Sequence, residues 1–356
     1  MRIAFDVSPL SHERTGIGNY ILGSLAGLAA VAAGEHEIVA FAPTSPGGLR
    51  RIPEAVDGLP SVRLELRFLP FAHFWRQAWS RLGRPPVERF LGPVDVLHYT
   101  DWMFPPQRGG IRSTMIHDLV PLHHREWVTP RTYSMHGAKY RDAANCATVF
   151  VNSEYTGRDV VATLGVDAAR VHVAPPGVGA SFASGGERAD LGGDYVLTVA
   201  TLEPRKNLDV LVRAHALLAG RMLLAVAGGE GWGAQPRLGA PGIVRLGRPT
   251  DDELARLYRG AAVVAYPSRL EGFGIPIVEA MACGTPVVAS SHSSMDEASG
   301  DVALRADPDD ASAWAEALVE AAARRDELAP RGIEHARSFT WRRVGETMLR
   351  AWEGAR

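Results

Sequence analysis

The chain has 356 residues, which predicts two domains at about 150 residues each. With 46% hydrophobic and 22% charged residues it has a globular rather than a disordered composition. Lys and Arg (38) nearly balance Asp and Glu (40), and the net charge of −2 argues against a protein that binds nucleic acid through bulk charge. The only two cysteines, Cys146 and Cys283, exclude a disulfide scaffold and favour a cytoplasmic, reducing compartment.

Short β-rich runs alternate with helical patterns in the first half of the chain. The predicted strands are Ile3–Val7, Glu37–Phe41, Val62–Phe68, Val94–Tyr99, Thr114–Asp118 and Thr148–Asn152, and the clearest helices are Asn19–Ala33 and Pro130–Asn145. Such alternation is typical of βαβ units in a parallel, doubly wound α/β sheet. The opening residues therefore read as a first strand rather than a signal peptide.

The pattern breaks around Pro175–Gly177, and the Gly-, Ser- and Ala-rich residues 179–193 are the best candidate linker. The alternation then restarts, with strands predicted at Tyr195–Ala200, Leu223–Ala227, Ile243–Leu246, Val263–Tyr266 and Pro286–Ala289, and helices at Leu208–Leu218, Asp251–Tyr258 and Pro276–Ala282. We therefore predict Rossmann-like domains over residues 1–178 and 179–338. Residues 339–356 form a C-terminal helix, with the N-terminal domain as its candidate packing surface.

The most specific motif runs from Glu271 through Gly272, Phe273, Gly274, Ile275 and Pro276 to Glu279. It follows a predicted strand and opens a helix, and the helix N-terminus and glycine backbone suit a phosphate. Both glutamates can serve an extended ligand. The alternative makes Glu279 a complement to the helix dipole and Glu271 a solvated loop charge.

A second motif, Glu203-Pro-Arg205-Lys206-Asn207, follows the strand predicted at Tyr195–Ala200. Two adjacent cations at a strand's carboxyl end suit a diphosphate. In the alternative interpretation this is a solvated loop with Asn207 as N-cap.

A third motif, Thr15-Gly16-Ile17-Gly18, follows the first strand. It lacks the third glycine of a dinucleotide-binding turn, which disfavours a dehydrogenase. We interpret it as a flexible loop leading into a helix.

In this order, the Gly16/Gly18 loop, the Arg205-Lys206 pair and the Glu271…Glu279 block resemble the family-4 retaining glycosyltransferases of GT-B fold. Ile116-His117-Asp118-Leu119, Asn152-Ser153-Glu154 and Ser293–Glu297 resemble the mannosyltransferase branch. The resemblance implies two Rossmann-like domains facing across a cleft, with the acceptor on the N-terminal domain and the nucleotide sugar on the C-terminal one.

The resemblance also implies roles for individual residues. Arg205 and Lys206 would bind the donor diphosphate and stabilise it as a leaving group, and Gly16 and Gly18 would close over it. Glu279 would hold the ribose hydroxyls, and Glu271 would contact sugar hydroxyls near the anomeric carbon. The backbone of Phe273, Gly274 and Ile275 would bind sugar or phosphate, and His117 the donor sugar; a structural histidine is the alternative for His117.

We expect no catalytic metal, because paired cations and helix N-termini can stabilise the departing diphosphate. Asp307-Pro-Asp309 is an Asp-x-Asp, but it precedes a helical pattern and reads as a turn and cap.

Residues 67–90 carry five arginines, one acid and several aromatics. A basic, aromatic helix could rest on an anionic membrane or grip a lipid-linked diphosphate. In the alternative its aromatics pack on the N-terminal sheet, which we favour for the tryptophans.

Together these features predict a retaining, metal-independent glycosyltransferase that moves a hexose, mannose from GDP-mannose, to a hydroxyl of a glycan or lipid-linked glycan. It would be cytoplasmic, with the inner face of the cell membrane as a peripheral site. A nucleotide-sugar epimerase, a sugar phosphorylase and a non-catalytic nucleotide-sugar-binding protein are the alternatives.

Overall fold

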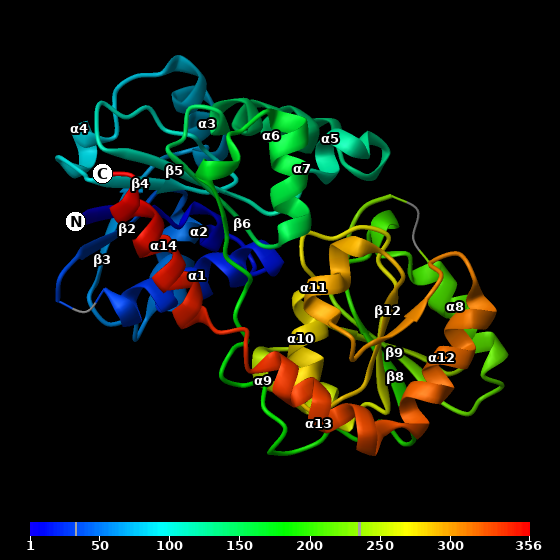
Figure 1. The fold of residues 1–356 in the computed structure, drawn as a ribbon. Helices are drawn as coiled ribbons and strands as arrows, with labels where there is room; N and C mark the ends of the chain where they lie inside the picture. Colours follow the sequence, from blue (N-terminus) through cyan, green and yellow to red (C-terminus); the bar gives the residue numbers. More distant parts are fainter. Residues whose placement is uncertain (33, 234–235) are drawn as a thin grey trace. The chain divides into compact units, whose positions relative to one another are not determined.

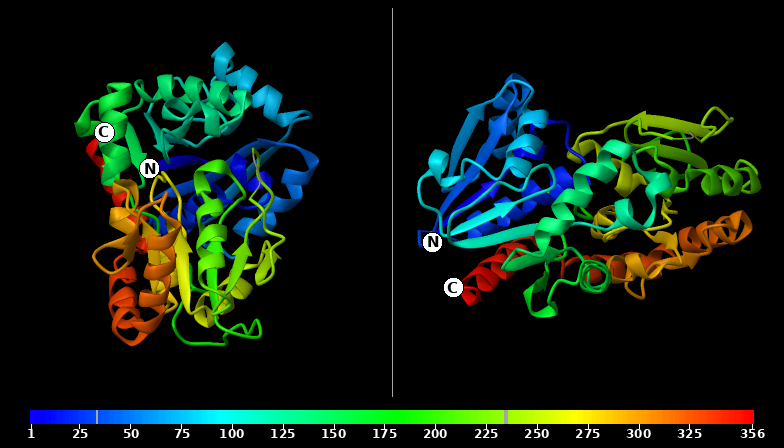
Figure 2. Two further views of the ribbon diagram at one scale, coloured as in Figure 1. Left: turned by 90° about the vertical axis from the view of Figure 1, so that its right-hand side faces the viewer. Right: turned by 90° about the horizontal axis from the view of Figure 1, so that it is seen from above.

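The computed structural model describes residues 1–32, 34–233 and 236–356. The chain divides into two compact units: Met1–Gly177 with Thr340–Arg356, and Val178–Phe339. Each unit contains one parallel β-sheet flanked by helices (Figures 1 and 2). Within the described ranges, no helix combines the length and apolar character needed to span a membrane.

The first unit is built on a seven-stranded sheet of order β3-β2-β1-β4-β5-β6-β7. The strands are β1 (Arg2–Asp6), β2 (Glu37–Thr44), β3 (Val62–Phe68), β4 (Val96–Tyr99), β5 (Ile111–Ile116), β6 (Thr148–Val151) and β7 (Val171–Val173). Its central strands are apolar and buried on both faces, as parallel strands covered by helices require. The winding direction changes between β1 and β4, where ligands of doubly wound sheets bind.

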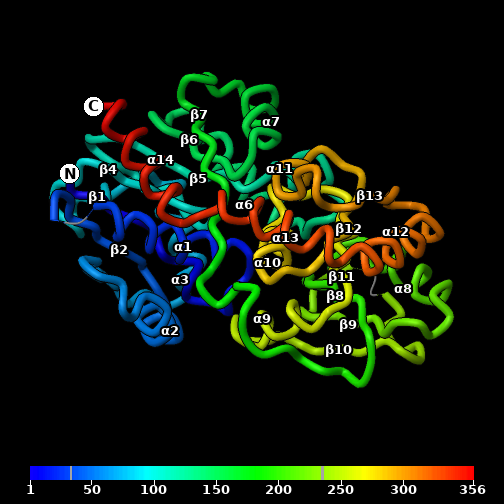
Figure 3. The backbone as a smooth tube through the Cα atoms, turned by 60° about the horizontal axis from the view of Figure 1, so that its bottom comes forward, coloured from blue at the N-terminus to red at the C-terminus, as the bar shows by residue number. Residues whose placement is uncertain are grey.

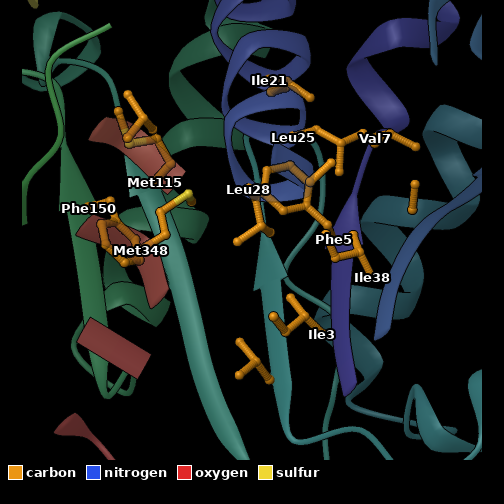
Figure 4. Packing of buried hydrophobic residues seen from close by; sticks show 14 of the residues in the cluster. Ile3, Phe5, Val7, Ile21, Leu25, Leu28, Ile38, Met115, Phe150 and Met348 are labelled. Carbon is orange, nitrogen blue, oxygen red and sulfur yellow. The ribbon is translucent and has the colours of Figure 1, made fainter. Parts of the chain in front are cut away.

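Eight helices belong to this unit among the described residues. They are α1 (Gly16–Val31), α2 (Pro46–Val56), α3 (Ala72–Leu82), α4 (Glu88–Leu91), α5 (Val120–His123), α6 (Pro130–Ala143), α7 (Glu154–Leu164) and α14 (Trp341–Gly354). In Figure 4, Ile21, Leu25 and Leu28 of α1 point toward β1 and its neighbours. Met348 of α14 lies beside Phe150 of β6 in the same cluster.

Helix α14 lies alongside α1, although the whole second unit separates them in sequence (Figure 3). Glycines allow the close approach, since a Cβ on Gly27 would lie 1.8 Å from the Trp341 carbonyl oxygen and one on Gly345 would lie 2.4 Å from the Gly27 carbonyl carbon. The Tyr20 and Trp341 rings meet edge to face at 5.7 Å. The C-terminal helix is thus an integral part of the first unit.

The second unit contains a six-stranded sheet of order β10-β9-β8-β11-β12-β13. Its strands are β8 (Tyr195–Val199), β9 (Leu223–Ala227), β10 (Ile243–Gly247), β11 (Val263–Tyr266), β12 (Val287–Ser290) and β13 (Leu304–Ala306). Its helices are α8 (Leu208–Leu217), α9 (Asp251–Gly260), α10 (Ile275–Ala282), α11 (Asp296–Ser299), α12 (Ala311–Ala323) and α13 (Arg325–Ala336). Here the switch point lies between β8 and β11.

The segment predicted as a linker is held against the second unit. The Arg259 guanidinium of α9 donates to the carbonyls of Ala183 and Glu187 at 3.1 and 2.7 Å, and the Ala189 amide donates to the Arg256 carbonyl at 2.9 Å. These bonds replace regular secondary structure in a stretch too rich in glycine and serine to form a helix or strand.

Two local predictions for the first unit are wrong. Gly16 and Gly18 lie in the first turn of α1 rather than in a loop before it, because Thr15 already occupies the N-cap position. Residues 67–90 do not form one helix: they comprise the end of β3, helix α3 and the short α4. The packing favoured for the tryptophans occurs at Trp79, which lies against a buried cluster of the first unit, but not at the exposed Trp75. Arg76 is buried, whereas Phe71, Phe74 and Trp75 are exposed.

Candidate functional site

Three predicted site residues of the second unit follow the carboxyl ends of β8 and β11. After β8 the chain forms a 3₁₀ turn, Pro204–Lys206, which carries Arg205 and Lys206. After β11 it runs through a loop to α10, which carries Glu271. Because β8 and β11 are neighbours, both loops emerge at the same switch point.

A buried ion-pair cluster joins these two loops. The Arg205 guanidinium and the Lys206 ammonium donate to different oxygens of the Glu271 carboxylate, each at 2.6 Å. Arg205 also pairs with Glu203 at 3.2 Å. Lys206 lies 3.4 Å from the Tyr266 hydroxyl and 5.4 Å from the centre of its ring. The alternative interpretation of Glu271 as a solvated charge is therefore wrong.

The surroundings keep Glu271 ionised. Burial alone would raise the pKa of its carboxyl, but Arg205 and Lys206 outweigh burial and lower that pKa to about 2. The Glu271 backbone amide donates to the Ser294 hydroxyl at 3.2 Å, which fixes the loop. The cluster thus holds two cations and two carboxylates, so an added diphosphate would have to share the cations with Glu271 and Glu203.

The glycine-rich loop leads directly into α10. Gly274 is the N-cap of α10 at a φ of 104°, and a Cβ there would lie 3.0 Å from the Ile277 side chain. A glycine is therefore needed to turn the chain into the helix. Phe273 is buried against Phe339, and Ile275 is the first residue of the helix.

Glu279 is buried on α10 and is separate from the Glu271 cluster in its hydrogen bonding. It accepts a hydrogen bond of 3.1 Å from the Tyr258 hydroxyl of α9. Burial raises the pKa of its carboxyl to about 7, with the Tyr258 bond opposing the shift. With a pKa of about 7, the buried carboxyl can donate a hydrogen bond when protonated and only accept one when ionised. Such a group can switch between the two when a ligand binds.

Asn207 is not the side-chain N-cap that the alternative interpretation assumed. Its backbone is left-handed, with φ 54°, and its amide donates to the Pro267 and Pro308 carbonyls at 3.2 and 2.7 Å. It therefore braces the loop that carries the two cations.

The first unit places His117 just beyond β5. Its side chain is 12% exposed, and its Nε2 lies 3.4 Å from the Asp101 carboxylate. Burial lowers the pKa of His117, although Asp101 opposes that effect, so the ring is largely neutral at pH 7. A neutral imidazole can donate one hydrogen bond and accept another.

Asp101 and Lys139 beneath His117 are not among the residues that the motifs identify. The buried Lys139 ammonium donates to Asp101 at 2.6 Å. Burial would raise the pKa of Asp101, but Lys139 and His117 outweigh it and hold the pKa well below its usual range. The available sequence signal for Asp101 is its place directly after a strand at the switch point.

Gly16 and Gly18 occupy the N-terminal turn of α1. Neither has a left-handed backbone. A Cβ on Gly16 would meet nothing within 4 Å, and one on Gly18 only ordinary contacts of 3.6 Å or more. Internal packing therefore does not explain these glycines, and the open backbone at a helix N-terminus suits an anion.

Asp307 and Asp309 form part of a turn, in which the Asp309 amide donates to the Asp307 side chain at 2.8 Å. The cap of α12 is Asp310, and Asp309 pairs with Arg269 at 2.5 Å. Among the described residues, no group of three or more His, Cys, Asp or Glu side chains is arranged to hold a metal ion.

Two family models match the chain. Residues 14–182 match the model described as Glycosyltransferase Family 4, and residues 193–324 match the model described as Glycosyl transferases group 1. The first lies almost wholly in the first unit and the second wholly in the second unit.

Curated relatives are similar over part of their length. The chain is 36% identical over 173 residues to O-antigen chain mannosyltransferase B of Escherichia coli, covering 45% of each chain. It is 35% identical over 241 residues to D-inositol 3-phosphate glycosyltransferase of Mycolicibacterium vanbaalenii, covering 58% of this chain and 52% of the relative. The chain thus spans about half the length of these relatives.

Solved structures share the fold. Sucrose-phosphate synthase from Thermosynechococcus elongatus superposes with a TM-score of 0.73 at 20% identity, covering 99% of this chain and 98% of that one. Anabaena HepE, in complex with UDP and glucose, gives 0.71 at 17% identity, covering 99% and 100%. The predicted GT-B class of two Rossmann-like domains is confirmed. The two family models together cover both units in chain order, and the chain belongs to the family-4 glycosyltransferases.

Proposed function

We propose that the chain is a retaining, metal-independent glycosyltransferase that moves a hexose, mannose from GDP-mannose, to a hydroxyl of a glycan or lipid-linked glycan. The observation that carries the proposal is the pair of largely buried cations, Arg205 and Lys206, at the switch point of the second sheet. Family membership supports the transfer reaction, and the similarity to a mannosyltransferase of Escherichia coli supports the sugar.

In the proposed reaction the acceptor hydroxyl attacks the anomeric carbon on the face that the diphosphate leaves. The bond between the anomeric carbon and the phosphate oxygen breaks, and that oxygen takes the acceptor proton. Arg205 and Lys206 stabilise the charge on the departing nucleoside diphosphate, the task that a metal ion performs elsewhere. Glu271 holds both cations in place and offers its carboxylate to the donor sugar.

The remaining predicted site residues bind or orient the donor. Glu279 accepts hydrogen bonds from the ribose hydroxyls, and the backbone of Phe273, Gly274 and Ile275 contacts sugar or phosphate at the start of α10. From the first unit, Gly16 and Gly18 offer amide groups to the diphosphate. His117, held by Asp101, binds the donor sugar.

Acceptor-dependent release of nucleoside diphosphate tests the proposal. Release only in the presence of acceptor supports a transferase, whereas conversion of the donor to another nucleotide sugar indicates an epimerase, and dependence on inorganic phosphate a phosphorylase. Binding without turnover indicates a non-catalytic protein. Proton NMR of the product distinguishes retention from inversion, and activity unchanged by EDTA supports metal independence.

A panel of nucleoside diphosphates identifies the base, because ligands that bind the native state raise its melting temperature with their affinity. GDP should give the largest shift. A larger shift with UDP would contradict the assignment of GDP-mannose.

Association with an anionic membrane through residues 67–90 is a separate part of the proposal. Its arginines favour an anionic surface, and the exposure of Phe71, Phe74 and Trp75 adds apolar contact area. Liposome binding that weakens with added salt supports it; no binding to anionic liposomes overturns it.

A further inference from the structure

A cavity of about 620 Å³ opens within the first unit, apart from the residues assigned to the donor but partly within the segment 67–90. His12 follows the first strand, and Ser45 follows β2 directly. The rest of its wall comes from helix α3 with the residue before it, Phe71, and from the N-terminal part of α6. The cavity therefore lies where the carboxyl ends of the strands place ligands in doubly wound sheets.

The wall of this cavity is cationic. It contains Arg76, Arg81 and Arg131 with two histidines, and no Asp or Glu among the residues that line it. In the described parts of the chain, no salt bridge involves any of these three arginines. Arg76 is 2% exposed, and its guanidinium donates only to the Ala72 and Ser8 carbonyls, at 3.2 and 3.4 Å.

The pKa values of the two histidines reflect the positive charge of these arginines, one of which, Arg76, interacts with the carboxylate of the buried Asp6. Burial, and after it Arg131 and Arg76, lowers the pKa of His73 to about 4. Burial, Arg76 and Arg51 likewise lower the pKa of His12. At pH 7 His73 is therefore neutral, and the arginines are the groups that attract an anion. Guanidinium groups match phosphate oxygens in pairs, and partial burial strengthens that attraction.

The rim of the cavity is apolar. Phe71 is 83% exposed and Phe74 64% exposed, and both line the cavity. Phe71 also has a left-handed backbone, with φ 50°, at the N-cap of α3. A left-handed backbone is unfavourable for an aromatic residue, and internal packing does not offset that cost here because the ring is exposed.

We propose that this cavity binds a phosphorylated amphiphile, with its phosphate on Arg76, Arg81 and Arg131 and its apolar part on Phe71 and Phe74. A soluble phosphate needs only the cations, whereas an amphiphile also covers the exposed rings. The role of this ligand as the acceptor rests on the proposed transferase function, whereas its binding to the cavity does not.

Calorimetric titration with dodecyl phosphate below its micelle concentration, without any nucleotide sugar, tests the proposal. Two probes separate the parts of the ligand: glycerol 3-phosphate has the phosphate without the chain, and dodecyl maltoside has the chain without the phosphate. We expect dodecyl phosphate to bind at least tenfold more tightly than either.

Variants locate the site. Arg81 and Arg131 are exposed, so the double variant Arg81→Gln with Arg131→Gln should still fold. It should bind dodecyl phosphate at least tenfold more weakly. Arg89→Gln, an exposed arginine of α4 that does not line the cavity, is the matched control and should leave affinity unchanged. Phe74→Ser should weaken the binding of dodecyl phosphate but not that of glycerol 3-phosphate. Its control is Leu217→Ser, at an exposed leucine of the second unit, which should change neither affinity.

If glycerol 3-phosphate binds as tightly as dodecyl phosphate, the claim that the ligand needs an apolar part is overturned. If dodecyl maltoside binds as tightly, the claim that it needs a phosphate is overturned. Equal loss in Arg89→Gln overturns the location. Donor turnover that depends on Lys206, together with no binding of dodecyl phosphate, would overturn this inference and leave the transferase standing. Binding without turnover on any acceptor would do the reverse.

Discussion

The Glu271 carboxylate accepts a hydrogen bond of 2.6 Å from the Lys206 ammonium, although 65 positions separate the two residues in the chain. The contact joins the loop after β8 to the loop after β11, so the same pair that would serve a diphosphate also holds this edge of the second unit together. Function and stability are therefore coupled at Glu271.

Glu271→Gln should destabilise the second unit by about 3 kcal/mol, because it leaves two largely buried cations without their shared carboxylate. Unfolding in urea measures the loss. Adding Lys206→Met to this variant should cost less than Lys206→Met alone, since the unpaired ammonium is then removed. Additive losses would contradict the coupling.

Lys206→Ala should lower turnover by at least about two orders of magnitude, because a cation on the leaving diphosphate acts mainly in the transition state. Steady-state release of nucleoside diphosphate measures it. Arg256→Ala is the control, since it removes a cation of the same unit that pairs only at the surface, with Glu187 at 3.2 Å. Turnover near that of the unaltered chain in Lys206→Ala would refute the phosphate assignment.

Glu279→Gln should stabilise the protein at pH 8 and weaken the binding of the nucleotide-sugar donor. Burial raises the pKa of Glu279 from 4.5 to about 7. As far as Glu279 is concerned, the folded protein therefore has its full stability below pH 4.5 and loses part of it as the pH rises through 7, because the buried carboxyl then ionises. The gain is at most about 3 kcal/mol at pH 8 and should shrink toward pH 5.

Thermal unfolding across that pH range measures the effect of Glu279→Gln. Glu334→Gln, at an exposed glutamate paired with Arg337, should show no such pH dependence. An unchanged melting temperature at pH 8 would argue against a raised pKa at Glu279. Unchanged donor affinity would argue against its role toward the ribose.

Gly16→Ala should keep or slightly raise stability, by up to about 1 kcal/mol, because the new methyl group enters open space in a helical turn. If the turn covers the diphosphate, the same change should raise the KM for the donor. Gly354→Ala, also helical with open space around it, should leave KM unchanged. A rise in stability with an unaltered KM would leave Gly16 without a ligand role.

The regular elements were predictable wherever periodicity was strong. Val62–Phe68, Leu223–Ala227 and Val263–Tyr266 occur with the predicted bounds, because runs of β-branched and apolar residues bounded by turns have few alternatives. The short edge strands Val171–Val173 and Leu304–Ala306 were not predicted. Three residues carry too little pattern to be recognised without the neighbouring strand.

The site was predictable as a set of motifs but not as a set of contacts. The positions of Arg205, Lys206 and Glu271 after predicted strands indicated the carboxyl edge of the sheet, whereas the adjacency of the two strands comes from the structure. That Glu271 pairs with both cations depends on side-chain directions that spacing does not specify. The segment 67–90 shows the same limit, because its composition does not reveal which side chains face the core: Arg76 is buried while Phe71 is exposed.

The packing of α14 on α1 also has a consequence for synthesis. The first unit lacks Val344, Met348 and Trp352 of its core until residues 178–339 have been translated. Its N-terminal part must therefore wait on the ribosome with the face of α1 around Gly23 and Gly27 uncovered, while the second unit has all of its own chain and can fold first. This topology predicts that the second unit completes its fold before the first, although the first unit begins earlier in the chain.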